Sequence, residues 1–210
     1  MYSYHDSATH LQHRQSGDVR RRCAINPTMQ LPTIETNRLV LQPWQPEDID
    51  ALHELWIDPA VRRYLWDDVI ISRARAVAAV HESIACSEER GLVQWAIRLK
   101  SVSALIGFCG YRPTEDADVE LLYGLAPACW HQGLATEAAR AVVRYGVEML
   151  GLVRILATTD APNTRSVRVL ERLGMRPRTC MSIDDDQLRH FVLNREDFRP
   201  ADATYRLSFT

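Results

Sequence analysis

The stretch Trp130–Ala139, with the sequence WHQGLATEAA, has the residue types of a loop that runs directly into a helix. No Ser, Thr, Asp or Asn stands just before the first helical residue, so the usual side-chain cap for the free N–H groups of a first turn is missing. A bound anion could accept these N–H groups, because a helix N-terminus carries a partial positive charge. Gly133 lacks a Cβ atom and would let an anion approach the backbone closely. The loop therefore has the properties of a cradle for a pyrophosphate group.

The loop alone leaves a second interpretation open, in which water caps the helix and Gly133 serves only the geometry of the turn. Its sequence is neither G-x-x-x-x-G-K-[ST] nor G-x-G-x-x-G, so it does not match the common nucleotide-phosphate loops. A nucleotide-binding loop of the first kind would also need a lysine and magnesium ligands, which this stretch lacks. Other parts of the chain must decide between a ligand and water.

Glu120 is the second group that could do chemistry. It lies in the strand-like segment 118–125, DVELLYGL, among apolar side chains. An acidic side chain in an apolar strand is costly unless it has a partner or is exposed. Glu120 could therefore line a cleft and act as a general base, or it could form an ion pair at the edge of the sheet. Strand alternation places Glu120, Leu122 and Gly124 on one face.

Hydrophobic periodicity divides the chain from residue 36 onward into strands and helices that must position these groups. Residues 134–150 repeat apolar side chains at helical spacing on a broad face, which is typical of a helix lying on a sheet. The predicted strands are 37–44, 93–99, 105–112, 118–125, 154–159, 180–183 and 188–193, and the predicted helices are 46–58, 72–91, 134–150 and 163–174. This order, β-αα-βββ-α-β-α-ββ, predicts one α+β domain on a mostly antiparallel sheet with a single parallel crossover.

The N-terminal 28 residues differ from the rest of the 210-residue chain, because they are polar and aperiodic. Such a segment cannot bury enough apolar surface to order itself, so we expect a disordered tail at 1–28 and a single domain at 29–210. Three histidines in the tail, His5, His10 and His13, could suggest a metal site. No Cys or acidic cluster completes a coordination shell around them, so we predict no metal.

Composition bounds the class of protein. The formal net charge of −2 argues against a broad nucleic-acid-binding surface. No apolar run approaches the roughly 18 residues of a membrane span. Five cysteines without a C-x-x-C pair indicate reduced thiols. These features predict a cytoplasmic protein that binds neither nucleic acid nor membranes.

The segment 119–175, VELLYGLAPACWHQGLATEAARAVVRYGVEMLGLVRILATTDAPNTRSVRVLERLGM, resembles the GNAT superfamily of acyl-CoA-dependent N-acyltransferases. It is most similar to the branch of the RimJ/RimL ribosomal-protein N-terminal acetyltransferases. The family loop Q/R-x-x-G-x-G/A falls on Trp130, Gly133 and Ala135; tryptophan departs from the superfamily pattern but is common in this branch. His131 stands where the branch often has a second glycine, which would make the cradle tighter. The GNAT fold implies a mixed, mostly antiparallel sheet with helices on both faces.

The resemblance implies acetyl-CoA as the acetyl donor. The strand before the loop would splay from its parallel neighbour, and pantetheine would lie in the gap. The implied contacts are the main chain of Gly124, Leu125 and Ala126 for pantetheine, the backbone N–H groups of His131, Gln132, Gly133, Leu134, Ala135 and Thr136 for pyrophosphate, and Asn163 and Ser166 for the pantetheine or sulfur end.

The implied activity is transfer of an acetyl group from the thioester to a primary amine by direct attack. An α-amine has a pKa of about 8 and is appreciably neutral near pH 7, so a weak base such as Glu120 or a water chain suffices. Leu170 stands where many relatives have a tyrosine that acts as general acid. Ser166 could donate a proton to the leaving thiolate instead, or it could make only structural contacts. An acceptor groove could use Trp56, Tyr64, Trp66, Trp95 and Tyr111, although core packing explains each equally well.

We therefore expect acetyl-CoA and an amine acceptor as partners of a monomer or homodimer without a metal. The acceptor would be a protein N-terminus or a small-molecule amine. Because the usual acid is missing, a non-catalytic acyl-CoA-binding sensor or regulatory module remains the alternative.

Overall fold

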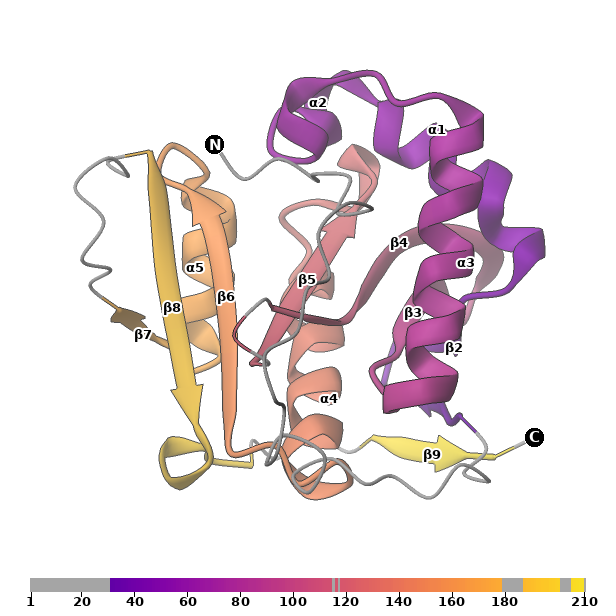
Figure 1. Cartoon of the computed structure of the whole chain (residues 1–210). Helices are drawn as coiled ribbons and strands as arrows, with labels where there is room; N and C mark the ends of the chain where they lie inside the picture. Colours follow the sequence, from indigo (N-terminus) through magenta and orange to yellow (C-terminus); the bar gives the residue numbers. More distant parts are fainter. Residues whose placement is uncertain (1–30, 115, 117, 179–186, 201–204, 210) are drawn as a thin grey trace, which may run out of the picture.

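The computed structural model describes residues 31–114, 116, 118–178, 187–200 and 205–209 (Figure 1). The predicted tail at 1–28 and the predicted strand at 180–183 lie outside these residues. Within the described ranges the strands form one nine-stranded sheet in the order β7-β8-β6-β5-β4-β3-β2-β1-β9. The strands are β1 (Thr33–Glu35), β2 (Leu39–Pro43), β3 (Gln94–Leu99), β4 (Val102–Pro113), β5 (Val119–Leu125), β6 (Arg154–Asp160), β7 (Arg176–Arg178), β8 (Leu188–Asn194) and β9 (Arg206–Ser208).

Neighbouring strands of this sheet are antiparallel, with β5 and β6 as the parallel exception. The parallel pair requires a crossover, and helix α4 supplies it between the two strands. The prediction of an α+β fold on a mixed, mostly antiparallel sheet with one parallel crossover is therefore confirmed.

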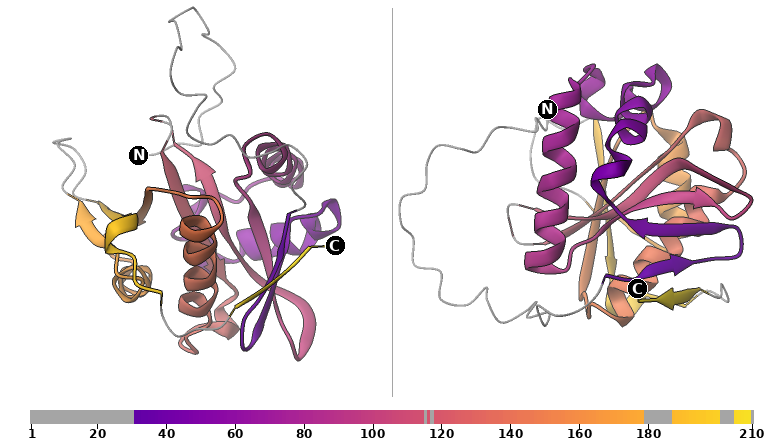
Figure 2. Two further views of the ribbon diagram at one scale, coloured as in Figure 1. Left: turned by 90° about the horizontal axis from the view of Figure 1, so that it is seen from below. Right: turned by 90° about the vertical axis from the view of Figure 1, so that its right-hand side faces the viewer.

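Helices cover both faces of the sheet, as the resemblance implied. They are α1 (Ile49–Ile57), α2 (Pro59–Arg62), α3 (Arg73–Arg90), α4 (Leu134–Glu148) and α5 (Thr164–Arg172). Figure 2 shows α3 and α4 on opposite sides of the sheet. One hydrophobic cluster joins residues of α4 and α5 to the sheet, and a second cluster joins α1, α2 and α3 to it. The strand side chains alternate between these two clusters, which is the period-2 pattern that a sheet covered on both faces requires.

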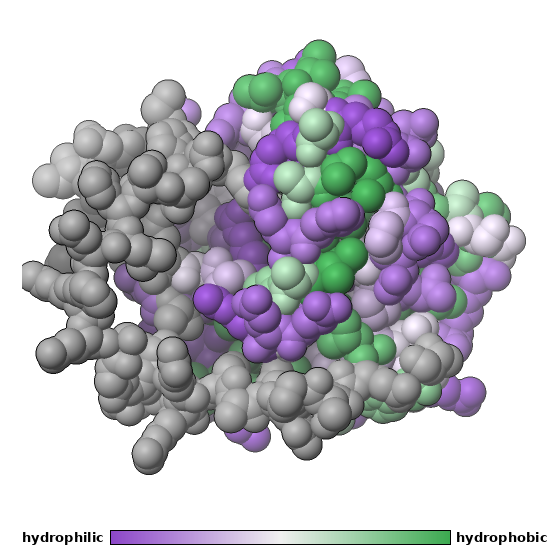
Figure 3. Space-filling model, turned by 45° about the vertical axis from the view of Figure 1, so that its right-hand side comes forward, coloured by the Kyte–Doolittle hydropathy of each residue, from purple (hydrophilic) through white to green (hydrophobic). Residues whose placement is uncertain are grey.

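Local signals at the helix ends act as predicted. Ser72 caps α3 by accepting a hydrogen bond from the Arg75 N–H group (3.2 Å), and Gly91 follows the last turn. Pro46 begins the 3₁₀ turn Pro46–Asp48, which leads into α1. The outer surface on the side of α3 is mixed, with hydrophilic residues over the helix and hydrophobic residues beside it (Figure 3).

Three short strands differ from the prediction. Strands β1 and β9 extend the sheet at one edge, and β7 begins at Arg176, before the predicted strand at 180–183. Each has three residues, too few to show an alternating pattern. Their positions come from their partners: Ile34 of β1 pairs with Leu41 of β2 and with Leu207 of β9.

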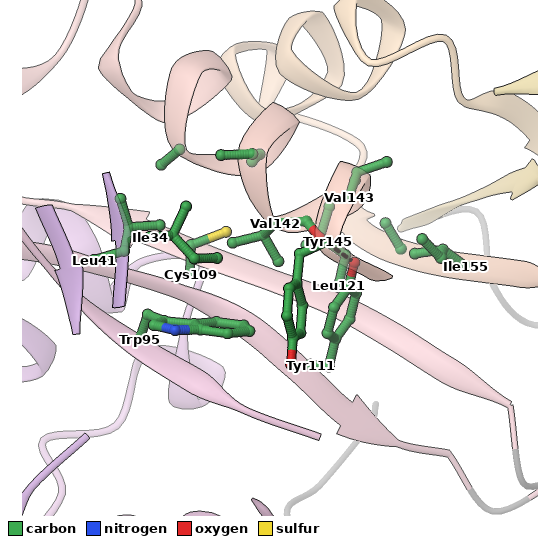
Figure 4. Close-up of a cluster of buried hydrophobic side chains, with 14 of the residues drawn as sticks. Ile34, Leu41, Trp95, Cys109, Tyr111, Leu121, Val142, Val143, Tyr145 and Ile155 are labelled. Atoms are coloured by element: carbon green, nitrogen blue, oxygen red, sulfur yellow. Dashed lines mark hydrogen bonds between the residues drawn. The ribbon is translucent and has the colours of Figure 1, made fainter. Parts of the chain in front are cut away.

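Helix α4 is held tightly against the sheet (Figure 4). The Tyr111 hydroxyl of β4 donates to the Val142 carbonyl of α4 at 2.8 Å. Trp95 and Tyr145 meet edge to face with their ring centroids 5.3 Å apart. A Cβ atom at Gly146 would lie 2.2 Å from the Tyr111 oxygen, so only glycine permits this approach. These contacts fix the helix whose N-terminus forms the proposed cradle.

Candidate active site

The parallel strands β5 and β6 separate in the middle of the sheet. Their register pairs Glu120 with Leu156 and no further described residue of either strand. Beyond that pair their C-terminal halves diverge, as Figure 1 shows. Strand β5 is paired with β4 over its whole length, so its other edge is left without a strand partner among the described residues past Glu120. The predicted splay is present, and it exposes main-chain groups of β5 that a ligand can pair with.

A cavity of about 280 Å³ lies at the C-terminal end of β5. Its walls come from α2, from β5, from the loop and first turn of α4, and from α5. Of the predicted cofactor residues, the cavity is lined by Gly124, Leu125, His131, Gly133, Leu134, Ala135, Thr136, Asn163 and Ser166. Residues from two distant parts of the sequence are thus brought together around one space.

Two predicted cofactor residues do not line this cavity. The Ala126 N–H group donates to the Ile106 carbonyl at 2.8 Å and so continues the sheet. The Gln132 side chain donates to the Ala128 carbonyl at 3.0 Å and so closes its own loop. Both residues support neighbours that do face the cavity.

Helix α4 begins without a side-chain cap, as predicted. Gly133 occupies the N-cap position with a φ of 76°, in the left-handed region that glycine adopts readily. The first backbone bond of the helix runs from the Glu137 N–H group to the Gly133 carbonyl (3.0 Å). The N–H groups of Leu134, Ala135 and Thr136 therefore have no acceptor within the part of the chain that the structure describes. They form the polar end of the cavity and are suited to an anion.

His131 also takes a left-handed backbone conformation, with a φ of 61°. Residues other than glycine adopt this region at a cost in steric energy, because their Cβ atom crowds the backbone. This conformation suits the glycine that the family resemblance implies at this position. The loop keeps the conformation that a glycine would favour, although it carries a histidine.

Trp130 attaches the loop to the end of β5. Its indole N–H group donates to the Leu125 carbonyl at 2.7 Å. The Arg165 guanidinium lies 3.9 Å from the centre of the Trp130 ring, in a cation–π contact. The first position of the loop motif is therefore a packing residue that links β5, the cradle and α5.

Sequence reasoning missed a row of cations along α5. Arg165, Arg168 and Arg172 all line the cavity. Their spacing of three and four residues places them on one side of the helix, and that spacing was visible in the sequence TRSVRVLER. Guanidinium groups bind phosphate oxygens well, so the α5 wall suits a ligand rich in phosphate.

A tyrosine that sequence reasoning also missed contacts Ser166 at the cavity. The Tyr123 hydroxyl lies 2.8 Å from Ser166 Oγ and 3.1 Å from the Ser166 carbonyl oxygen. Burial raises the pKa of the Tyr123 phenol, and the hydrogen bond with Ser166 offsets this only in part. Asn163 caps α5 by accepting from the Ser166 N–H group at 3.3 Å. Asn163 and Tyr123 together hold Ser166 in place.

Glu120 forms an ion pair with Arg112 of β4. Both Nε (2.8 Å) and Nη2 (2.7 Å) of Arg112 contact its Oε2 atom. The residue is 6% exposed and does not line the cavity. No described residue donates to its Oε1 atom. The predicted ion pair is present, but it is buried on a strand inside the sheet and does not lie at an edge. The role of general base stays a prediction.

Of the five aromatic residues proposed for an acceptor groove, four pack in the hydrophobic clusters and one lines the cavity. Trp66 is partly buried against the second cluster. Trp56, Trp95 and Tyr111 are buried in the two hydrophobic clusters. Tyr64, just after α2, lines the cavity. Packing is therefore sufficient to explain the buried aromatic residues, and Tyr64 is the one of them that faces the cavity.

The described residues contain neither a cluster of metal ligands nor a helix that could span a membrane. No group of three or more His, Cys, Asp or Glu side chains in the described ranges is arranged to hold a metal ion. None of the described helices combines the length and the apolar composition needed to cross a membrane.

Comparison with known proteins identifies the family. The model of the acetyltransferase (GNAT) domain matches residues 38–176. The uncharacterized N-acetyltransferase YoaA of Bacillus subtilis (strain 168) is 30% identical over 145 residues, which cover 68% of this chain and 82% of YoaA. The uncharacterized N-acetyltransferase p20 of Bacillus licheniformis is 31% identical over 150 residues, covering 69% of this chain and 82% of p20.

Solved structures show the same fold. RimL, a ribosomal L7/L12 α-N-protein acetyltransferase solved in complex with coenzyme A, superposes with a TM-score of 0.66 at 17% identity. The superposition covers 79% of this chain and 98% of RimL. The sequence match and the shared fold agree with a cavity built around an uncapped helix start and two diverging strands. The chain belongs to the GNAT family of acetyltransferases and is an N-acetyltransferase of that family.

Proposed function

We propose that this N-acetyltransferase takes its acetyl group from acetyl-CoA and transfers it to a primary amine by direct attack. The observation that carries the proposal is one cavity that extends from the uncapped start of α4 to the Tyr123–Ser166 pair. Its anion-binding end and its hydroxyl-bearing end are lined by residues of the same elements, α4, β5 and α5. This arrangement suits a long donor with phosphates at one end and a reactive group at the other.

The fit of the residues to acetyl-CoA supports this assignment. The N–H groups of the loop and first turn, from His131 to Thr136, would hold the pyrophosphate. The free edge of β5 at Gly124 and Leu125 would pair with pantetheine. The guanidinium groups along α5, with Arg165 nearest the loop tryptophan, would bind further phosphate oxygens. RimL, which shares the fold, was solved with coenzyme A.

The reaction forms a C–N bond between the amine and the acetyl carbonyl and breaks the C–S bond. Acetyl-CoA supplies the activated thioester. The amine must be neutral to attack, and it loses one proton after the bond forms. Glu120 is the proposed acceptor of that proton, directly or through water, with its Oε1 atom. The electron pair of the broken bond leaves with the thiolate.

Ser166 is proposed to stabilise the departing thiolate by a hydrogen bond rather than by transferring a proton. A proton from Ser166 would have to be replaced by Tyr123, because the serine hydroxyl does not ionise in this range. A tyrosine has an ordinary pKa of about 10 and a thiol one of about 8.5. Burial raises the pKa of Tyr123 further, so proton transfer to the thiolate is uphill. A hydrogen bond has no such cost.

Tyr123 would orient that hydrogen bond. The one proton of the Tyr123 hydroxyl is within reach of the Ser166 carbonyl oxygen (3.1 Å) and of Ser166 Oγ (2.8 Å), and the proposal places it on the nearer atom, Oγ. Ser166 Oγ then accepts from Tyr123 and keeps its own proton for the cavity. In this arrangement Ser166 contacts the sulfur, and Tyr123 is a positioning residue.

The acceptor is proposed to be the α-amine of a protein or peptide, or a small-molecule amine. Tyr64, together with Ala60, Val61 and Leu65 around α2, forms one wall of the cavity. An α-amine has a lower pKa than a lysine side chain, about 8 against about 10.4, so it needs less help from a base. The candidate base, Glu120, is bound by Arg112, so the site favours an amine that needs less help to lose its proton.

The activity is tested by incubating the full chain with acetyl-CoA and a panel of amines. The panel contains a peptide with a free N-terminus, the same peptide with a blocked N-terminus and a free lysine, an amino acid and a polyamine. We expect amine-dependent release of CoA thiol and a product heavier by one acetyl group in mass spectrometry. Tight binding of acetyl-CoA with no release by any amine would favour the alternative, a non-catalytic acyl-CoA-binding module.

Removing the Tyr123 hydroxyl tests the role of Ser166. For both Ser166→Ala and Tyr123→Phe we expect kcat to fall about tenfold, the value of a hydrogen bond of roughly 1.4 kcal/mol. The double variant should lose no more than Ser166→Ala alone, because Tyr123 acts through Ser166. The dissociation constant for CoA, measured by calorimetry, should stay unchanged.

Tyr111→Phe is the matched control for this series. Its hydroxyl is also buried in a hydrogen bond, to the Val142 carbonyl, but it does not line the cavity. It should lower the melting temperature and leave kcat intact. Additive losses in the Tyr123 and Ser166 variants would show that the two hydroxyls do not act as one unit.

A further inference from the structure

Arg38, in the turn between β1 and β2, contacts both the loop before α4 and the first turn of α4. Its Nη1 atom donates to the Gln132 carbonyl at 3.0 Å. Its Nε and Nη2 atoms each lie 2.7 Å from the Glu137 Oε2 atom. A Cβ atom at Gly133 would lie 3.7 Å from Arg38 Nη2. The guanidinium is therefore immediately beside the N-cap glycine of the proposed cradle.

Glu137 places a negative charge in the same turn of α4. Partial burial by itself would raise its pKa, but hydrogen bonds from Thr36 and Arg38 outweigh this and lower the pKa below its ordinary value. The carboxylate is therefore ionised at neutral pH. An anion in the first turn stabilises the helix, but it repels a second anion that binds the same N-terminus.

The carboxylate is held in place without the guanidinium. The Thr36 hydroxyl donates to Glu137 Oε1 at 2.6 Å, and the main-chain N–H group of Arg38 donates to the same atom at 2.9 Å. Both donors remain when the Arg38 side chain is replaced. Loss of the guanidinium would thus leave a fixed, unneutralised charge next to the cradle.

We infer that Arg38 is a positioning and charge-neutralising residue for acetyl-CoA, a role that rests on the proposed function of the cradle. The residue compensates Glu137, so that the helix N-terminus can accept pyrophosphate. It also binds the Gln132 carbonyl and so holds the loop that presents the N–H groups. Glu137 positions Arg38 but opposes the ligand once Arg38 is gone.

A double-mutant cycle on the full chain tests this inference. For Arg38→Gln we expect the dissociation constant for CoA, measured by calorimetry, to rise about tenfold. This is the effect expected when one partly exposed charge, the Glu137 carboxylate, repels the ligand from nearby. Glu137→Gln alone should change it by less than about threefold, because the substitution removes a charge that repels the ligand but also the group that positions Arg38. The double variant should bind CoA several times more tightly than Arg38→Gln. Inorganic pyrophosphate should follow the same order.

The rescue separates the inference from a merely structural role. If Arg38 only braced the fold, removing its partner as well would not restore binding. The loss in Arg38→Gln should also shrink between about 0.05 and 0.5 M salt, because salt shortens the Debye length and screens the repulsion between Glu137 and the ligand. In assays with an amine, KM for acetyl-CoA should rise while kcat stays close to that of the wild type.

Arg144→Gln is the matched control, since it breaks another Arg–Glu contact on α4, with Glu148 at the far end of the helix. It should leave CoA affinity unchanged. If Arg38→Gln does not fold, Arg38→Lys carries the comparison, with a smaller rise that Glu137→Gln again reverses. Unchanged CoA affinity in the Arg38 variants, or no rescue by Glu137→Gln, would overturn the inference. Failure of the wild type to bind CoA would instead overturn the proposed function.

Discussion

Replacing Gly133 by glutamate is expected to abolish the stabilisation that CoA or acetyl-CoA confers on this protein. A ligand that binds only the native state stabilises it by about 2.7 kcal/mol at a concentration of 100 times its dissociation constant. For a chain of this size that corresponds to a rise of roughly 5 to 10 °C in melting temperature. The glutamate would place a carboxylate where the pyrophosphate is proposed to lie. The measurement is thermal unfolding with and without ligand.

The space around Gly133 allows the substitution to be interpreted. The nearest atom to an added Cβ is Arg38 Nη2 at 3.7 Å, which is an ordinary contact. The φ of 76° disfavours any side chain by about 1 to 2 kcal/mol. Gly133→Ala and Gly133→Gln have the same backbone cost, and glutamine has the size of glutamate without its charge. Both should retain part of the ligand-induced shift.

A Gly133→Glu variant that folds and binds CoA as tightly as the wild type would contradict the cradle. The uncapped first turn would then be satisfied by water, which is the interpretation that the loop sequence alone leaves open. A loss of equal size in Gly133→Ala would point to backbone strain instead of charge.

Glu120→Gln is expected to lower kcat/KM on the order of 10²-fold, a usual value for one general base. The substitution keeps the shape of the side chain and removes its basicity. The loss should shrink as the pH rises, because an α-amine with a pKa of about 8 is about 1% neutral at pH 6 and about 90% neutral at pH 9. Affinity for CoA should stay unchanged. Initial rates over pH 6 to 9 and calorimetry with CoA provide the two measurements.

Arg112→Gln is the control that separates the base from the ion pair. It removes both contacts to Glu120 Oε2 but keeps the carboxylate. Its loss of kcat/KM should be much smaller than that of Glu120→Gln, while both variants lose stability. Full activity of Glu120→Gln from pH 6 to 9 would show that the carboxylate serves the ion pair alone. The amine would then lose its proton to water or to another group.

Local patterns determined the elements that carry the site. The helical periodicity after Gly133 and the lack of a capping side chain predicted both the position of α4 and its free N–H groups. The apolar alternation of the strands predicted β3, β4, β5 and β6, together with the parallel crossover. These features depend on residues close in sequence, so a single chain is enough to predict them.

The three-residue strands could not be predicted in the same way. Strands β1, β7 and β9 have three residues each, and they exist because a neighbouring strand offers hydrogen bonds. Such a contribution comes from the partner and leaves no periodic pattern in the strand itself. The predicted strand at 180–183 lies outside the described residues and stays a prediction.

The sequence by itself determined the fold class, the family and the uncapped start of α4, because a helix start, a glycine turn and the strand order are properties of neighbouring residues. Only the tertiary structure decided what each polar side chain contacts. It joined Glu120 to Arg112, Tyr123 to Ser166 and Arg38 to Glu137, over separations of 8, 43 and 99 residues. The physical reason is that ion pairs and hydrogen bonds depend on distances of about 3 Å, which only the folding of remote segments onto one another sets.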